Sequence, residues 1–585
     1  MNYRTRLSPA AFASLPARGK SGEGGLTLSR RLTLLSPALL PWALGAGLAL
    51  AALGAARTHA PDPADELFQS TNVIRISITI PDEGVRELSH AGARRSQPKP
   101  KAQATVTEAG RTYTNVSVQL KGFTTFRPIH RGPSLTLNFE RNSPKQLFHG
   151  LAKISLNNSL QDRTRLNEKF SRELFAAAGV PVPRADYALL TLNGRELGLY
   201  VLTEGYDRDF LKRHFARHDG NLYEGGILRD IDGPLQLNTG KPPAADARVR
   251  QLITATREPD PARRLQAVRD ALDLDRFLSM MAMETILCHS DSYSMNRNNY
   301  RIYHDPATDK LVFMPHGMDR VLGTHRSSLD LSVVPPVLGM VAAAILSTPE
   351  GRRLHVERVA TFATNLFHPD ALSRRVQEID ARIASAKLIS GEDSPSSVSP
   401  PAGRQGSDAD ELCERIAKRA ADLRLQLARL PDLLLLPRTL AFAAGSIEQI
   451  NDWTLRPKAG QPDVAWQNDA PDGNSVARGI ASAGPMRTSV RSRVKLPAGR
   501  YRLEGRPRVT NDQGPARVVS LALLRHSGSR FDEDLSRLPA NPVRFEFQVD
   551  AARGPEEVEF ICDIRDSSSH VWFDPSPLHL VREGN

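Results

Sequence analysis

The stretch His289–Gly323 reads HSDSYSMNRNNYRIYHDPATDKLVFMPHGMDRVLG. It holds the candidate functional residues around which the rest of the chain is interpreted. A loop rich in Asp and Asn precedes two strand-like runs joined by a turn, and Asp319 follows the second run. A carboxylate such as Asp291 can orient a hydroxyl group and accept its proton. An amide such as Asn296 and a second carboxylate can hold Mg²⁺ against phosphate oxygens. The stretch therefore predicts a magnesium–nucleotide site on a loop and a hairpin.

The composition is that of a globular, multi-domain protein. A chain of 585 residues corresponds to roughly three or four domains. The net charge is +12, but residues 1–60 hold seven Lys/Arg against Glu23 alone, which accounts for half of the excess. The remainder is only mildly basic, and no basic run is interleaved with aromatic residues. These features argue against a nucleic-acid partner.

The N-terminal segment, residues 1–60, is predicted to be an export signal or a signal anchor. No charge interrupts residues 32–56, and Arg30 and Arg31 precede them. About 25 apolar residues can span a bilayer, and the small residues at the end also permit cleavage. We therefore expect the rest of the chain to be exported across the cytoplasmic membrane. It would be periplasmic, on the cell surface or secreted, with membrane contact only through residues 32–56.

The three cysteines, Cys288, Cys413 and Cys562, lie far apart and form no C-x-x-C motif. Such a sparse, odd set argues against a disulfide framework or a zinc site, so each is predicted to be a small buried residue. His289 and His316 are expected to order loops, because no H-E-x-x-H motif accompanies them.

Residues 70–435 read as a sheet-rich segment, 70–204, followed by a helix-rich segment, 205–435. An Asn193-Gly194 turn between two apolar runs is a strong hairpin signal. The other predicted elements are strands at 73–81, 153–158 and two within 103–123, and helices at 83–91, 163–180, 260–287, 333–346 and 351–386. The first strands are expected to form an antiparallel sheet, and residues 61–65 a linker.

The sequence pattern changes in the C-terminal third of the chain. Residues 391–411 are a low-complexity insert, and an Arg-rich helix at 408–430 is expected to be a solvated amphipathic helix. Short alternating runs separated by turns then predict a jelly-roll-like β-sandwich at 440–585. Trp453, Trp466 and Trp572 could line a sugar-binding face or belong to the core.

Several segments, in order, resemble the CotH family, the spore-coat atypical protein kinases and their bacterial relatives. They lie between about residues 73 and 325 and include VQLKGFTTFR, PSLTLNFE, LNGRELGLYVLTEGYDRDFL, GNLYEGG, HSDSYSMNRNNYRIYHD and FMPHGMDRVLG. The spacing Asp291-x-x-x-x-Asn296 is also that of a protein-kinase catalytic loop, and Asp319 falls where kinases place a metal-binding Asp. The resemblance implies an α+β fold with an atypical bilobal kinase-like domain, its small lobe at 70–204 and its large lobe at 205–435.

The resemblance also implies roles for individual residues. Asp291 would orient the substrate hydroxyl, and Asp319 would bind Mg²⁺ with help from Asn296, or from Asn298 or Asn299 in another register. The cofactor-binding candidates are the nucleotide-gripping Lys121, Glu204 near adenine, and Glu173 as the small-lobe ion-pair partner, with Glu168 as the alternative to Glu173.

Two departures from the family pattern affect these assignments. Many relatives carry a basic pair where this chain has Arg131-Gly132, so Arg127 or Arg131 could supply part of the phosphate clamp. Many also carry W-D-x-D where this chain has His316-Gly317-Met318-Asp319, so only the second acid is kept. The H-G-x-D version resembles a branch of the same family.

The predicted function is transfer of the γ-phosphate of ATP, with Mg²⁺, to Ser or Thr of envelope, coat or secreted proteins. The alternative is a catalytically inactive kinase scaffold that acts in envelope structure or binds a polysaccharide or another partner. A glycosidase, which needs two carboxylates across a sugar cleft, is a weaker option.

Overall fold

The structure, a computed structural model, describes residues 62–90, 99–241, 247–324, 328–390 and 407–440, and residues 443–583 with several short gaps. Residues 62–585 belong to one unit in their contacts. The predicted export segment lies outside the described residues, as does most of the predicted insert 391–411. Among the described helices, none is long and apolar enough to cross a membrane.

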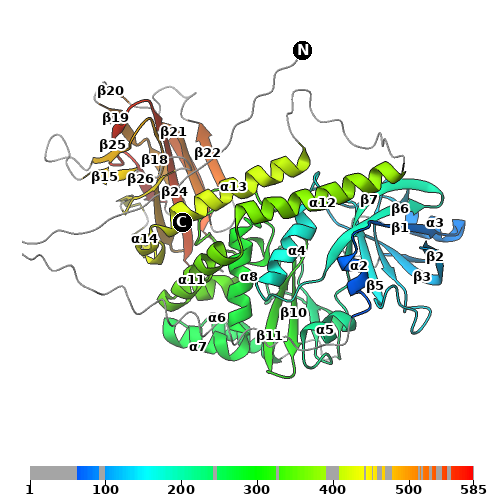
Figure 1. Ribbon diagram of the computed structural model, residues 1–585. Helices are drawn as coiled ribbons and strands as arrows, with labels where there is room; N and C mark the ends of the chain where they lie inside the picture. The colour runs from blue at the N-terminus through cyan, green and yellow to red at the C-terminus, as the bar shows by residue number, and fades with distance from the viewer. Residues whose placement is uncertain are drawn as a thin grey trace, which may run out of the picture. The chain divides into compact units, whose positions relative to one another are not determined.

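The strands of the sheet-rich segment close into a barrel of order β1-β2-β3-β4-β5-β7-β6 (Figure 1). They are β1 Ile74–Thr79, β2 Lys101–Glu108, β3 Arg111–Lys121, β4 Ser134–Asn138, β5 Lys153–Asn157, β6 Ala185–Leu192 and β7 Arg195–Glu204. Alternation along β1 buries Ile76 and Ile78, as a strand with one face in a core requires. The antiparallel sheet expected of the first strands is confirmed from β1 to β4. In addition β1 pairs in parallel with β6, with Ile76 opposite Leu190, and this pairing closes the barrel.

The hairpin predicted at Asn193-Gly194 is confirmed as β6–β7. Leu192 pairs with Arg195, and the two turn residues have φ angles of 48° and 75°. Both angles are those of a type I′ turn, whose twist suits the flanking strands. The side-chain Nδ2 of Asn193 also donates to the carbonyl of Ile80 at 2.9 Å, so the turn is fastened to the chain leaving β1.

Three helices accompany the barrel segment: α2 Asp65–Gln69, α3 Asp82–Ser89 and α4 Asn167–Ala177. Residues 61–65 are not a free linker, because Asp62 and Asp65 form ion pairs with Arg184 at 2.9 and 2.6 Å. The helix predicted at 163–180 begins only at Asn167. Asp162 accounts for this delay, since its carboxylate accepts hydrogen bonds from the backbone N–H groups of Thr164 and Asn167.

The helix-rich segment contains a small sheet of order β11-β10-β8-β9. Its strands are β8 Leu222–Glu224, β9 Gln236–Thr239, β10 Tyr300–Asp305 and β11 Lys310–Pro315. Its helices are α5 Arg208–His214, α6 Ala247–Thr256, α7 Pro261–Ala271, α8 Leu274–Ile286, α9 Tyr293–Asn296, α10 Met340–Leu346, α11 Pro349–Asn365, α12 Pro369–Ser390, α13 Asp408–Leu427 and α14 Leu430–Leu434. The hairpin predicted in the stretch His289–Gly323 is confirmed, with Tyr300 opposite Pro315, and it packs on the almost wholly buried α8.

The C-terminal segment is built from strands around one apolar core. Its sheets have the orders β12-β17-β24-β21-β22 with β14 beside β17, β13-β26-β18-β23, and β15-β16-β25-β19-β20. The strands are β12 Arg438–Thr439, β13 Ile447–Gln449, β14 Thr454–Pro457, β15 Ala465–Gln467, β16 Arg478–Ala481, β17 Met486–Leu496, β18 Gly499–Gly505, β19 Arg508–Asn511, β20 Gly514–Pro515, β21 Val518–Arg525, β22 Arg530–Asp534, β23 Val543–Val549, β24 Glu556–Asp566, β25 His570–Asp574 and β26 His579–Arg582. Trp453 belongs to this core, so its suggested place on a sugar face is wrong. The fold as a whole is therefore mixed α+β.

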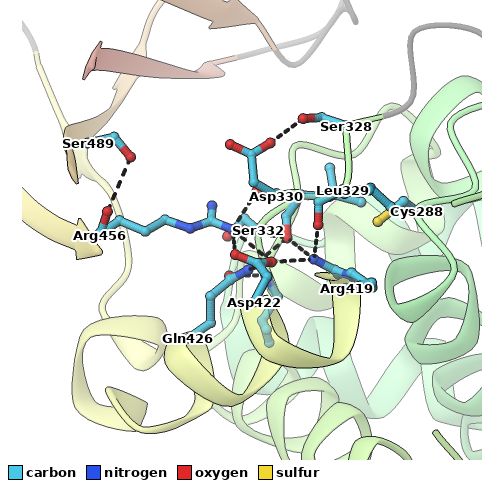
Figure 2. A network of polar contacts seen from close by, with 12 residues as sticks. Cys288, Ser328, Leu329, Asp330, Ser332, Arg419, Asp422, Gln426, Arg456 and Ser489 are labelled. Atoms are coloured by element: carbon cyan, nitrogen blue, oxygen red, sulfur yellow. Dashed lines mark hydrogen bonds and ion pairs between the residues drawn. The ribbon is translucent and has the colours of Figure 1, made fainter. Parts of the chain in front are cut away.

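A buried polar network joins α13 to the C-terminal strands (Figure 2). Asp422 accepts hydrogen bonds from Arg419 at 2.7 Å and from Arg456 at 3.2 Å. Arg419, which has no exposed surface, also donates to the carbonyls of Thr285 and Ile286 at the end of α8. The predicted solvated face of the 408–430 helix is therefore wrong at this position, because a guanidinium that satisfies several carbonyls and a carboxylate can be buried.

Candidate active site

The loop after α8 holds Asp291 in a fixed orientation. One carboxylate oxygen of Asp291 accepts a hydrogen bond from Asn296 at 2.7 Å, and the other accepts one from Asn299 at 3.0 Å. Asn299 also donates to the backbone carbonyl of Asp291 at 2.9 Å. The short helix α9, capped by Ser292, brings Asn296 back toward Asp291. The structure thus joins the predicted Asp291–Asn296 pair and adds Asn299, one of the two alternatives, to it.

The buried acid Glu284 is hydrogen-bonded to the loop that carries Asp291. Glu284 of α8 accepts a hydrogen bond from the backbone N–H of Ser294 at 3.3 Å, and its other carboxylate oxygen has no partner among the described residues. Burial raises the pKa of Glu284 to about 7, although contacts with Ser294 and Ser292 oppose that rise. The sequence reasoning missed Glu284, because an acid within an apolar helical run gives no sign of which loop folds over it.

The segment that follows β11 is hydrogen-bonded to the loop that carries Asp291. The backbone N–H of His316 donates to the carbonyl of Asn299 at 2.8 Å, and His289 bonds the carbonyl of Gly317 at 3.0 Å. The side chain of His289 therefore helps to order loops, as predicted, whereas His316 contributes through its backbone N–H. Gly317 has φ +56°, and a Cβ at this position would lie 2.6 Å from the side chain of Asn299. The absence of an acid at Gly317 thus has a steric reason in this chain.

Asp319 lies in strongly negative surroundings. Burial, followed by the nearby negative charges of Glu168, Asp162 and Asp291, raises the pKa of Asp319 to about 7. Within the described residues, no side chain donates a hydrogen bond to its carboxylate, whereas its backbone carbonyl accepts one from Asn167 at 3.1 Å. Excess negative charge of this kind favours a cation.

Glu168 of α4 connects the barrel to this acidic cluster. One oxygen of Glu168 accepts from Arg172 at 2.5 Å, and the other accepts from the backbone N–H of Met318 at 2.7 Å. Burial opposes ionisation of Glu168, but Arg172 and the Met318 N–H outweigh it, so its pKa is lowered. Glu168 therefore fixes the residue immediately before Asp319.

Lys121 ends β3 beside Glu168. Burial lowers the pKa of Lys121 to about 8, while the negative charge of Glu168 acts in the opposite direction. Within the described residues, no hydrogen bond holds the Lys121 ammonium group. The basic alternatives Arg127 and Arg131 are exposed on the connection between β3 and β4.

The structure does not bring Glu173 to this cluster. Arg375 of α12 holds both oxygens of Glu173 at 2.8 and 2.9 Å, and Lys169 lies 3.2 Å away. Five residues along a helix correspond to a rotation of about 140° relative to Glu168, so the two acids point to different neighbours. Glu168, the alternative to Glu173, is the acid whose charge acts on both Lys121 and Asp319.

Glu204 is engaged in ion pairs. It ends β7 with a side chain only 1% exposed, bonded by Arg213 and Arg184. Burial opposes its ionisation, but hydrogen bonding by Arg213 and the charges of both arginines lower its pKa. Its carboxylate therefore fastens α5 to the barrel, and its oxygens are already taken by the two arginines rather than open to adenine.

The donor set fits a magnesium ion that also binds phosphate. Among the described residues, no three His, Cys, Asp or Glu side chains form a complete metal-binding group. Mg²⁺ commonly uses one or two protein ligands and takes the rest from water and substrate phosphates. Asp319, whose carboxylate has no side-chain donor among the described residues, and the amide of Asn296 would suffice for that arrangement.

Cys288 and Cys562 are buried, as predicted, whereas the prediction is wrong for Cys413, which is partly exposed. Burial raises the pKa of Cys288 to about 11, which disfavours a thiolate nucleophile next to His289.

A family of known proteins matches the part of the chain that contains these loops. Residues 120–410 match the family described as CotH kinase protein. This match assigns residues 120–410 to the CotH family and defines this part of the chain as kinase-like. Over 255 residues it is 22% identical to the inner spore coat protein H of Bacillus subtilis (strain 168), covering 40% of this chain and 69% of that protein.

Solved structures give weaker likenesses. The Helicobacter pylori proinflammatory kinase CtkA is 11% identical with a TM-score of 0.23, covering 52% of this chain and 95% of that one. TmCBM61, solved in complex with β-1,4-galactotriose, is 14% identical with a TM-score of 0.16, covering 23% of this chain and 91% of that one.

Proposed function

We propose that this chain is an exported CotH-like protein kinase that transfers the γ-phosphate of ATP to Ser or Thr of envelope, coat or secreted proteins. The observation that carries the proposal is the meeting of two loops. Asp291 is locked by Asn296 and Asn299 on one loop, and the other loop, which carries Asp319, is bonded to the first and to Glu168.

In this mechanism Asp291 would orient the acceptor hydroxyl and take its proton. The hydroxyl oxygen forms a bond to the γ-phosphorus, the bond from that phosphorus to the β–γ bridging oxygen breaks, and ADP leaves. Lys121 would bind phosphate oxygens from the barrel side, and Glu168 would hold Lys121 and the Met318–Asp319 backbone together. A magnesium ion held by Asp319 and Asn296 would neutralise charge on the phosphates.

The test is transfer of label from γ-labelled ATP to the full-length protein itself or to casein. We expect Asp291→Ala and Asp319→Ala each to lower the rate at least about 100-fold, because transfer depends on positioning and charge stabilisation. Glu173→Ala is the matched control, since that acid lies on the same helix as Glu168 but outside the cluster, and its rate should stay near that of the parent. Unchanged transfer in both Asp variants would exclude the assignment.

A second candidate function is polysaccharide or partner binding by an inactive scaffold. It is supported by the outward row His570, Trp572 and Asp574 of β25, which alternates with buried Val571 and Phe573. Gly479 lies opposite Trp572, and a Cβ there would be only 3.0 Å from the indole ring. One sheet face therefore presents a half-buried aromatic ring flanked by polar groups, an arrangement on which a sugar ring can stack.

The two candidates differ in two measurements on the full-length protein. A kinase should show a rise in melting temperature with Mg-ATP, whereas a scaffold should show none and should be retained on an immobilised polysaccharide. Trp572→Ala should abolish that retention. The control Ile447→Ala removes an exposed apolar residue from another sheet and should not.

A further inference from the structure

Arg320 follows Asp319 in the chain and forms an ion pair with Asp291. The proposed mechanism gives Arg320 no role. Its Nη1 atom is 3.6 Å from the nearer carboxylate oxygen of Asp291, and its side chain is 30% exposed. Its Nε is buried without a hydrogen-bond partner within the described residues. A separation of 3.6 Å is an ion-pair distance but exceeds that of a hydrogen bond, so the guanidinium keeps its donors available.

The two other guanidinium groups near the cluster, those of Arg172 and Arg301, have partners of their own. Arg172 donates to Glu168 and to the carbonyl of Pro183 at 2.9 Å. Arg301 pairs with Glu224 at 3.1 Å and donates to the carbonyl of Tyr300. Among the described residues, neither guanidinium group contacts Asp291, so neither serves the loop that carries it.

The surroundings of Arg320 suit an incoming phosphoryl group. Asp291, which would receive the acceptor hydroxyl, is on one side of it, and Asp319, the candidate magnesium ligand, precedes it in the chain. During transfer the γ-phosphorus must lie between the acceptor hydroxyl oxygen and the departing β–γ bridging oxygen, which leaves its other oxygens open to a donor beside Asp291. A planar guanidinium can donate two parallel hydrogen bonds to phosphate oxygens, which a point charge cannot.

We propose that Arg320 is a catalytic residue that hydrogen-bonds the γ-phosphoryl oxygens during transfer while its charge attracts Asp291. This proposal rests on the proposed kinase function. Negative charge spread over the equatorial oxygens in the transition state would be stabilised by a donor already in place. Atoms and charge balance as in the transfer step above, because Arg320 donates hydrogen bonds and keeps its proton.

The experiment compares Arg320→Gln, Arg320→Lys and Arg320→Ala in the full-length protein, with Arg163→Gln as the matched control. Arg163 forms only exposed ion pairs, with Asp408 and Glu411. We expect Arg320→Gln to lower kcat by about 10²–10³-fold, the effect of removing one donor from developing charge, with KM for Mg-ATP within about threefold of the parent. Arg320→Lys should recover part of the rate, and added guanidinium chloride at low concentration should accelerate Arg320→Ala but not the parent.

Each other outcome excludes a specific claim. A parent protein that neither binds Mg-ATP nor transfers phosphate would remove the proposed function, and the role of Arg320 with it. An active parent with kcat of Arg320→Gln within threefold would remove the role of Arg320 alone. Loss of Mg-ATP binding and of melting temperature in Arg320→Gln, without guanidinium rescue of Arg320→Ala, would show that the residue is structural.

Discussion

At the scale of single residues, Lys121 gives a pH dependence with a definite sign. Burial lowers its pKa to about 8, so the ammonium group loses its proton above that pH in the free protein. A bound nucleotide favours the charged form and raises the pKa again. The affinity for ATP should therefore be constant below pH 8 and fall by up to about tenfold per unit above it.

Calorimetric titration of the parent and of Lys121→Met between pH 7.5 and 9.5 tests this expectation. Lys121→Met should bind ATP at least about tenfold more weakly at pH 7.5, because an opposite charge is lost, and its affinity should not decline with pH. Arg131→Met serves as the control, since that arginine is exposed on the neighbouring connection. A parallel decline in parent and Lys121→Met would assign the dependence to another group.

Asp319 gives a second prediction, on stability. Its pKa, raised to about 7 by burial and by Glu168, lies above that of an unfolded Asp. The folded state therefore holds a proton that the unfolded state has lost between about pH 4 and 7, and stability falls as pH rises through that window. With metal removed by chelator, Asp319→Asn should be more stable than the parent at pH 8 by roughly 4 kcal/mol and about equal to it near pH 4. Denaturant midpoints at the two pH values measure this, and a parent at least as stable at pH 8 contradicts it.

The sequence could predict the residue pairs that are close in the chain. Asp291 and Asn296 are five residues apart in one loop, so their spacing carried the information, and they do hydrogen-bond. Glu168 and Glu173 lie on the same helix, and nothing in the local pattern states which one faces Asp319. That choice depends on Met318 and Arg375, which are 150 and 202 residues away.

At the scale of elements, Glu284 ties α8 to the loop above it. Its pKa, raised to about 7 by burial, exceeds the ordinary value of 4.5, so the folded state binds the extra proton. Stability should fall between about pH 4.5 and 7 as this carboxyl group ionises under the loop. Glu284→Gln keeps the shape and an acceptor oxygen but cannot ionise.

The prediction is that Glu284→Gln becomes more stable than the parent as pH rises from 5 to 8, by roughly 2 kcal/mol. All other titrating groups are shared, so the difference between the two urea midpoints at each pH isolates Glu284. Glu350→Gln, at an exposed position on α11, is the control and should show no such trend. A constant difference over this range would mean that Glu284 does not titrate there.

The sequence could predict whether a segment is a helix or a strand where the local residue pattern determines it. It could not predict which distant strands pair with each other. Alternation identified β1, and Asn193-Gly194 identified the β6–β7 hairpin. The parallel pairing of Ile74 with Ala188 spans more than one hundred residues and leaves no local signal. Helix α10 was predicted to begin at Val333 but begins at Met340, because the N–H groups of Leu338 and Gly339 bond Ser294 instead.

At the scale of the whole molecule, the network around Asp422 links three parts of the chain (Figure 2). Arg456, from the C-terminal strands, donates to Asp422 and to carbonyls of Asp330 and Leu331, which follow the Asp319 loop. Arg419 donates to Asp422 and to the end of α8, which leads into the Asp291 loop. One carboxylate therefore compensates two buried cations on opposite sides of it. Composition and periodicity could not predict this network, because its members come from distant segments.

Removing that carboxylate should cost far more than breaking an exposed ion pair. Asp422→Ala leaves Arg419, which is fully buried, and Arg456 without their shared partner, a change that typically costs about 3–5 kcal/mol. Arg353→Ala, which breaks exposed pairs with Glu350 and Glu357 on α11, should cost less than about 1 kcal/mol. Thermal unfolding of the full-length variants measures the difference.

Arg456→Ala separates the two functions of the network. It removes the contact from the C-terminal strands but leaves Arg419 paired with Asp422, so it should destabilise less than Asp422→Ala. Limited proteolysis should then cut the connection between α14 and β14 faster while the α8 region stays protected, because Arg419 still holds the carbonyls of Thr285 and Ile286. Equal losses of melting temperature in Asp422→Ala and Arg456→Ala would mean that the C-terminal contact, rather than the buried charge of Arg419, dominates the energy of the network.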